Sequence, residues 1–218
     1  MVNLIGGSLP EIFITLFLAI AALAIAISVH ESAHAWMANR LGDPTARHLG
    51  RISLNPLVHI DLLGTIIVPI LFLLQAGILF GWAKPTPFNP WNLKNPRADA
   101  ALISLAGPAS NLVLATVFGL AFRAFAGNDL VAVILFRLIT LNLVLAFFNL
   151  LPIPPLDGFK VVGGILPRSL ASQWESLERY GILILLAFFF FGAPIIQPLL
   201  GFFVGSFLQI ITGASLSL

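Results

Sequence analysis

Residues 12–37 read IFITLFLAIAALAIAISVHESAHAWM. No charged residue occurs between Ile12 and Val29, and a helix needs about 20 predominantly apolar residues to cross a bilayer. The stretch therefore predicts a membrane-crossing helix. It also carries three ionisable residues near its C-terminal end, His30, Glu31 and His34, and such residues inside a span usually have a function because burying them in lipid is costly.

Four further apolar regions follow along the chain, at residues 62–82, 98–122, 130–151 and 180–211, the last of them interrupted at 192–194. Hydrophobic residues make up 59% of the 218 residues and charged residues 9%, whereas soluble domains carry about 25% charged residues. The sequence predicts an all-α multi-pass membrane protein with about four to six transmembrane helices. A chain of this length suits a single domain, residues 1–218.

Basic residues indicate how the chain is oriented. Lys and Arg gather in three loops, residues 40–59, 83–97 and 152–179, and the first ten residues have none. The positive-inside rule places these loops in the cytoplasm and the N-terminus outside the cell membrane. The N-terminus also lacks the basic region of a cleavable signal, so we expect the first span to be retained.

The same rule creates a conflict at residues 62–82. A full crossing there would separate two loops that both belong to the cytoplasm. A re-entrant segment within residues 62–90 removes the conflict, and Gly64, Pro69, Gln75 and Gly77 would let it turn. Irregular backbone at this depth is tolerated where protein or a water-filled cavity covers it, so re-entry is favoured over a span.

The pattern H-E-x-x-H, from His30 to His34, predicts a metal site. On a helix, residues four positions apart lie on the same face, so both imidazoles can bind one zinc ion, and the intervening Glu31 can act as general base. The alternative is a pair of histidines that reach toward the membrane boundary.

A catalytic zinc ion usually has three protein ligands. The chain has no cysteine, so the third ligand must be His, Asp or Glu. Asp157 follows the fourth apolar region, in NLLPIPPLDG from Asn149 to Gly158, where prolines could turn the carboxylate back into the site. An Asp-Gly pair is also common in ordinary turns, and the spacing leaves both interpretations open.

Two asparagines also lie within or next to apolar regions. Asn111 belongs to GPASN, from Gly107 to Asn111, and a polar amide inside a span needs a partner. Asn111 and Asn149 could bind the substrate backbone or stabilise an oxyanion. The alternatives are close helix packing of the small residues Gly107 and Ser110 and a helix cap at Asn149.

Together, H-E-x-x-H at 30–34, GPASN at 107–111 and the segment that ends in L-D-G at 156–158 resemble the site-2 protease family of intramembrane zinc metalloproteases. The resemblance covers about residues 20–165. It implies that His30, His34 and Asp157 bind one Zn²⁺ per chain, that Glu31 is the catalytic base, and that both asparagines lie near the active site. The stretch GWAKP at 81–85 is similar to a small subgroup that lacks an inserted peptide-binding domain.

The function expected is hydrolysis of peptide bonds in membrane-spanning proteins or membrane-embedded peptides, with the active site toward the cytoplasm and membrane lipid around the chain. The alternatives are a metal-binding membrane transporter and a catalytically silent membrane scaffold. A formal net charge of +2 gives no reason to expect a nucleic-acid partner. For His48 and His59 three roles stay open: a fourth ligand, an inhibitory ligand or a surface histidine, of which the last is favoured.

Overall fold

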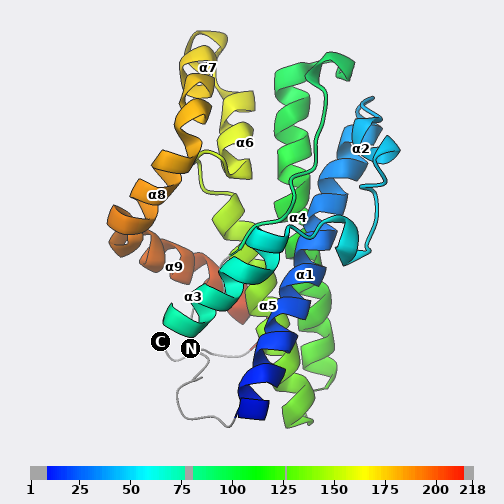
Figure 1. Ribbon diagram of the computed structural model, residues 1–218, viewed down its shortest axis with the longest axis vertical. Coiled ribbons are helices and arrows are strands. Elements are labelled where there is room, and N and C mark those ends of the chain that lie inside the picture. The colour runs from blue at the N-terminus through cyan, green and yellow to red at the C-terminus, as the bar shows by residue number, and fades with distance from the viewer. Residues whose placement is uncertain (1–8, 77–80, 126, 214–218) are drawn as a thin grey trace.

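The computed structural model describes residues 9–76, 81–125 and 127–213, and every regular element within them is a helix (Figure 1). The longer helices are α1 (Leu9–Arg40), α3 (Val68–Ala76), α4 (Pro96–Ala124), α5 (Asp129–Asn149), α6 (Asp157–Ile165), α7 (Arg168–Glu175), α8 (Gly181–Phe191) and α9 (Ala193–Thr212). The short ones are α2 (Thr45–His48), the 3₁₀ turns Pro56–Val58, Pro90–Asn92 and Ser176–Tyr180, and one π-helical turn, Leu62–Ile67. The all-α prediction is confirmed.

Four helices, α1, α4, α5 and α9, are long and apolar enough to cross a membrane. Helix α4 lies at the centre and packs against α1, α5, α6 and α9. One buried apolar cluster joins α4, α5 and α9 through Ala115, Ile139, Leu143 and Leu208. The long helices predicted at 12–37, 98–122 and 130–151 are confirmed, with ends that differ from the prediction by three residues or fewer.

Capping residues explain where the central helices begin. Pro96 stands at the first position of α4, where a missing N–H costs nothing. The carboxylate of Asp99 then accepts the N–H of Asn95 at 2.8 Å. The side chain of Asn128 accepts the N–H of Val131 at 3.1 Å and so caps α5.

The two ends of the apolar segment 62–82 lie side by side. The N–H of Trp82 donates to the carbonyl of Gly64 at 3.0 Å, and Thr65 Oγ1 donates to the carbonyl of Trp82 at 2.9 Å. The apolar helix between them covers Leu62–Gln75 and is too short to count as a span. A short apolar helix whose flanking residues meet fits the re-entrant segment favoured from the sequence, which stays a prediction; of its expected turning residues, Gly77 lies outside the described residues.

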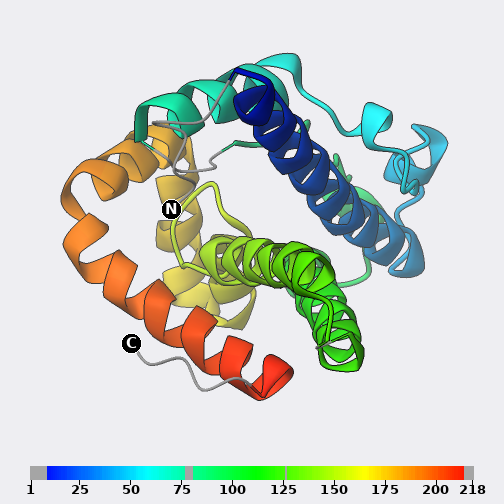
Figure 2. The same ribbon diagram turned by 90° about the horizontal axis from the view of Figure 1, so that it is seen from below.

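The fifth apolar region is divided at Gly192 into α8 and α9. Helix α8 has 11 residues, about 16 Å of helix, which is half of what a bilayer core requires. Helix α9 has 20 residues and is long enough to cross. Figure 2 shows α8 and α9 as an arc along one flank of the central helices.

The connections with most basic residues gather at one end of the molecule. In Figure 1, α2 and α7 lie at the top, and the turn between α4 and α5 lies at the bottom. Helix α1 runs toward the end with the basic loops, so that His30 and His34 lie in the part of α1 nearer Arg40.

Candidate metal centre

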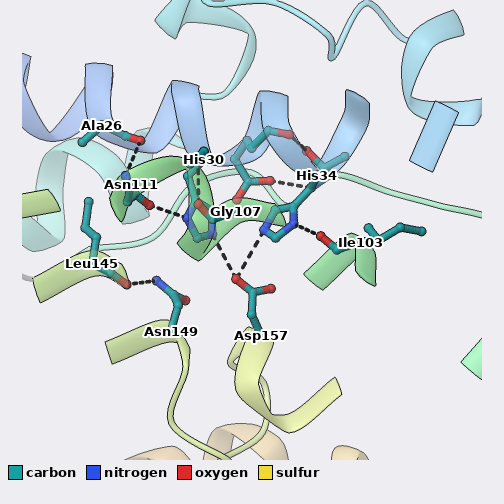
Figure 3. Close-up of polar contacts among 12 residues, drawn as sticks. Ala26, His30, His34, Ile103, Gly107, Asn111, Leu145, Asn149 and Asp157 are labelled. Carbon is teal, nitrogen blue, oxygen red and sulfur yellow. Dashed lines mark hydrogen bonds and ion pairs between the residues drawn. The ribbon is translucent and has the colours of Figure 1, made fainter. Parts of the chain in front are cut away.

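Three potential metal ligands meet between α1 and the start of α6. The Nε2 atoms of His30 and His34 lie 3.0 Å and 3.3 Å from the same Asp157 oxygen, Oδ2. Their ligand atoms all lie within 4.8 Å of one another, and the histidines are buried. Figure 3 shows the two imidazoles directed at the carboxylate from one side. The structure thus brings together the three residues that the sequence singled out.

The connection after α5 carries Asp157 to the histidines. Asp157 is the first residue of α6, and Gly158 follows it in the tight approach of α6 to the end of α5. A Cβ atom on Gly158 would lie 2.2 Å from the carbonyl oxygen of Leu150. Gly158 is not among the positive-φ glycines of the described residues, so close packing is what requires a glycine here.

Hydrogen bonds at the far side of each imidazole select its tautomer. His34 Nδ1 lies 2.7 Å from the carbonyl oxygen of Ile103, which can only accept, so Nδ1 carries the proton. His30 Nδ1 lies 2.6 Å from Asn111 Oδ1, which likewise only accepts. In a neutral imidazole the proton on Nδ1 leaves the Nε2 lone pair free to bind a metal.

Asn111 is itself fixed by a second asparagine. Its Nδ2 group donates to the carbonyl of Ala26 at 3.2 Å and to Asn142 Oδ1 at 2.9 Å. Both asparagines are fully buried. Sequence reasoning missed Asn142, although an amide within the fourth apolar region was a sufficient signal that it needs a partner. The direct substrate contact expected for Asn111 would require it to give up one of these bonds.

Gly107 in α4 faces the metal ligands directly. A Cβ atom there would lie 2.4 Å from His34 Nε2 and 2.6 Å from His30 Nε2. The two atoms that would bind the metal therefore lie against a position without a side chain. The sequence left close helix packing open as the reason for this glycine. The structure shows that the space beside Gly107 is occupied by the imidazoles of His30 and His34.

The three ligand atoms fit a zinc ion in type and arrangement. Two imidazole nitrogens and a carboxylate oxygen are a common catalytic zinc set, which leaves one coordination position open. Burial acts to raise the pKa of Asp157, but the positive charge of protonated His34 and His30 holds that pKa well below its usual range. A metal cation between the three ligand atoms would favour the carboxylate in the same way.

Glu31 lies next to the ligands in sequence and is half-buried. Its Oε2 atom accepts the backbone N–H of Thr86 at 2.9 Å, and its own carbonyl accepts Thr86 Oγ1 at 3.2 Å. Thr86 belongs to the extended segment that precedes the 3₁₀ turn Pro90–Asn92. Sequence reasoning did not single out Thr86.

The remaining candidates, Asn149, His48 and His59, do not belong to the ligand cluster. Asn149 is half-buried, and Figure 3 places it on the same side of the histidine pair as Asp157; its Nδ2 group donates to the carbonyl of Leu145 at 2.9 Å. His48 is exposed, as expected for a surface histidine. For His59 this interpretation was wrong: only 1% of its surface is exposed, because the loop folds inward and His59 Nε2 bonds to the carbonyl of Ser53 at 2.8 Å.

A cavity of about 610 Å³ lies between α1 and α4, near Ser32 and Trp36. Its walls include neither Glu31 nor the three ligands. This cavity is therefore separate from the candidate metal centre.

Comparison with known proteins gives the following relatives. The profile of peptidase family M50 matches residues 123–192. YwhC of Bacillus subtilis, described as a "putative zinc metalloprotease", is 38% identical over 192 aligned residues, which cover 83% of this chain and 84% of the relative. Rip2 of Mycolicibacterium smegmatis and Rip2 of Mycobacterium tuberculosis carry the same description and are 30% and 29% identical, over 77% and 78% of this chain. The chain spans 64% and 65% of these two proteins, slightly less than two thirds. No solved structure matches.

Proposed function

Because this chain belongs to peptidase family M50, we propose that His30, His34 and Asp157 bind one zinc ion and serve peptide-bond hydrolysis in membrane-spanning substrates. The chain is a zinc metalloprotease with four helices long and apolar enough to be membrane spans. The observation that carries the residue assignment is the convergence of three buried or half-buried ligand atoms within 4.8 Å.

Two groups of α4 fix the orientation of both histidine ligands. The zinc ion, when bound, polarises the scissile carbonyl group and acidifies water so that it can lose a proton near neutral pH. His30 and His34 offer Nε2 because Asn111 and the carbonyl of Ile103 hold Nδ1. Asn111 supports the site by fixing the His30 ring, since its amide group is already engaged with Ala26 and Asn142.

Glu31 is the general base of the proposed reaction. It takes the proton of the attacking water and later gives it to the leaving amine. Within residues 9–76, 81–125 and 127–213, the amide of Asn149 has one hydrogen bond, to Leu145, so its second N–H can stabilise the negative charge developing on the substrate carbonyl. Removal of one such donor costs about 10²–10³ in kcat in other peptidases.

The substrates are membrane-spanning segments that unwind locally. The backbone amides of a helix are bonded to one another, so the helix must open before water can attack a carbonyl. The extended, proline-rich part of residues 62–90 lies beside Glu31 through Thr86 and can pair with the opened strand. If helix-breaking residues placed in a substrate span leave its cleavage rate unchanged, this route is wrong.

The reaction takes place in the cytoplasmic half of the cell membrane. The apolar run of α1 begins at Ile12, so His30 lies about 27 Å along it at 1.5 Å per residue, within the far half of a hydrocarbon core about 30 Å thick. The basic loops near Arg40 mark the cytoplasmic side. Water for hydrolysis then enters from the cytoplasm.

The decisive comparison is between the wild-type chain and Glu31→Gln, both purified in detergent. We expect each to contain about one zinc ion, and only the wild-type chain to cleave membrane peptides, since Gln cannot accept the proton. A metal transporter would instead move zinc into liposomes, and a scaffold would do neither. Equal cleavage by wild type and Glu31→Gln would remove Glu31 from the chemistry.

A further inference from the structure

Residues 81–89 form an extended strap that is tied to the fold at alternate residues. The backbone N–H groups of Trp82, Lys84 and Thr86 donate to Gly64 O, His59 O and Glu31 Oε2, at 3.0, 3.0 and 2.9 Å. In an extended chain, the N–H groups of every second residue point to the same side, so this spacing shows that the strap is extended. At its far end the strap is anchored by the N–H of Asn89, which donates to Asp43 Oδ2 at 2.7 Å.

Thr86 is the member of this series that meets the carboxylate of Glu31. It stands between Pro85 and Pro87, and proline has no backbone N–H. Thr86 is therefore the single main-chain donor among residues 85–87. Its hydroxyl also bonds to the carbonyl of Glu31 at 3.2 Å, so that one residue contacts both the backbone and the side chain of Glu31.

We propose that Thr86 is a positioning residue for Glu31: its backbone N–H holds one carboxylate oxygen and leaves the other free to face the reacting water. This inference rests on the proposed role of Glu31 as general base. A glutamate side chain rotates about several bonds, and a base must lie within hydrogen-bond reach of the proton it removes. A bond to a main-chain donor restricts this rotation better than a bond to a mobile side chain.

The fold makes Thr86 a rigid donor. Pro85 and Pro87 restrict the backbone on both sides of Thr86. Lys84, two residues before Thr86, donates its backbone N–H to the carbonyl of His59. Buried Arg51 reinforces the same stretch, because its Nη1 atom donates to the carbonyl of Val58 at 2.6 Å in the loop that carries His59. Within the described residues, the hydrogen bond seen at the Glu31 carboxylate comes from the backbone N–H of Thr86.

The test uses Thr86→Pro, which removes the N–H, and Thr86→Val, which removes only the hydroxyl and keeps the branched shape. Cleavage of a membrane peptide is measured with the full-length, zinc-loaded chain. Thr86→Pro is expected to lower kcat about 100-fold, with KM changed less than about threefold and zinc content unchanged. Thr86→Val keeps the N–H and is expected to retain most of the wild-type kcat.

Lys94→Pro is the matched control. It adds a proline to the same connection at an exposed residue after Leu93, whose ψ of 145° a following proline accepts. We expect cleavage by Lys94→Pro to match wild type. Equal losses of kcat in Lys94→Pro and Thr86→Pro, or in both Thr86 variants, would overturn the proposal, because general loosening of the connection or lost packing would then explain the effect.

A spectroscopic measurement decides the question if Thr86→Pro does not fold. The chain has seven threonines, so ¹⁵N-threonine labelling gives few amide signals, and Thr86→Val identifies that of Thr86. An amide that donates to a carboxylate should move upfield when Glu31→Gln replaces the charged acceptor. No movement of this signal would refute the contact. Loss of cleavage in Glu31→Gln but not in Thr86→Pro would reject this inference alone, whereas cleavage by Glu31→Gln would reject the proposed function.

Discussion

At the scale of single residues, Gly107 limits what the metal centre can tolerate. The Cβ of Gly107→Ala would enter the space of both Nε2 atoms, 2.4 Å from His34 and 2.6 Å from His30. We expect zinc affinity to fall about 10- to 100-fold, the range seen when the support of a metal ligand is disturbed. Competition with a chelator of known affinity measures the zinc affinity of both variants.

Gly201→Ala is the control for this substitution, because no heavy atom lies within 4 Å of a Cβ on Gly201 in α9. Alanine there should leave zinc binding unchanged and favour the helix by about 1 kcal/mol. Wild-type zinc affinity in Gly107→Ala would show that the histidines do not approach α4 as described.

Asp43 is a second residue on which the site depends, through the strap. Its side chain is fully buried and accepts bonds from Asn89 N, Thr45 Oγ1 and Asn92 Nδ2 at 2.6–2.7 Å. Burial acts to raise the pKa of Asp43, but these bonds outweigh burial and hold the pKa below its usual value. The ionised form therefore stabilises the fold.

Asp43→Asn should lower the free energy of unfolding at neutral pH by about 1–3 kcal/mol, since a buried donor loses its acceptor. Because the pKa of the folded state is the lower one, the wild-type advantage is complete above the unfolded value of about 3.9 and is lost as pH falls through the folded value. Unfolding of both chains in detergent at several pH values measures this difference in the free energy of unfolding. An advantage that grew on acidification would contradict the assignment.

At the scale of elements, the position of α6 against the end of α5 determines where Asp157 lies. A Cβ on Gly158 would lie 2.2 Å from the Leu150 carbonyl oxygen, and backbone cannot move aside cheaply. Gly158→Ala should destabilise the chain by about 1–3 kcal/mol and weaken zinc binding together with it. Thermal unfolding and metal titration of one preparation test this. Unchanged values for both would mean that α6 is not held this closely.

The sequence predicted elements well where one local property was sufficient. Long apolar runs predicted α1, α4 and α5, and the interruption at 192–194 marked the division between α8 and α9. The H-E-x-x-H pattern works because α1 itself brings the two histidines onto one face.

Contacts between distant elements could not be predicted in this way. Spacing left Asp157 open between a ligand and a turn residue, and the family resemblance favoured the ligand. The pairing of Asn111 with Asn142, the inward turn of His59 and the contact of Thr86 with Glu31 depend on how separate helices and loops meet. A pattern within one segment carries no information about such tertiary contacts.

At the scale of the whole molecule, the proposed topology puts three loops on one side of the membrane. The chain has no cysteine, so single cysteines can be placed at the exposed positions Leu49, Lys94 and Ser169. We expect an impermeant thiol reagent to label all three from the cytoplasmic side, because Trp82 is bonded to Gly64 and Lys84 to His59, which brings the chain after the apolar segment back beside the chain before it. Asn128→Cys, in the turn between α4 and α5, is the control and should be labelled from the opposite side. Labelling of position 94 together with position 128 would mean that residues 62–82 cross the membrane.

The most direct test of the central claim is the zinc content of the purified chain, measured by mass spectrometry of the metal. Wild type and His48→Ala should each contain about one zinc ion per chain, because His48 is exposed and lies outside the cluster. His30→Ala, His34→Ala and Asp157→Ala should each lose most of the metal, since two protein ligands hold zinc far more weakly than three. A full equivalent of zinc in Asp157→Ala would contradict a metal centre built between α1 and α6.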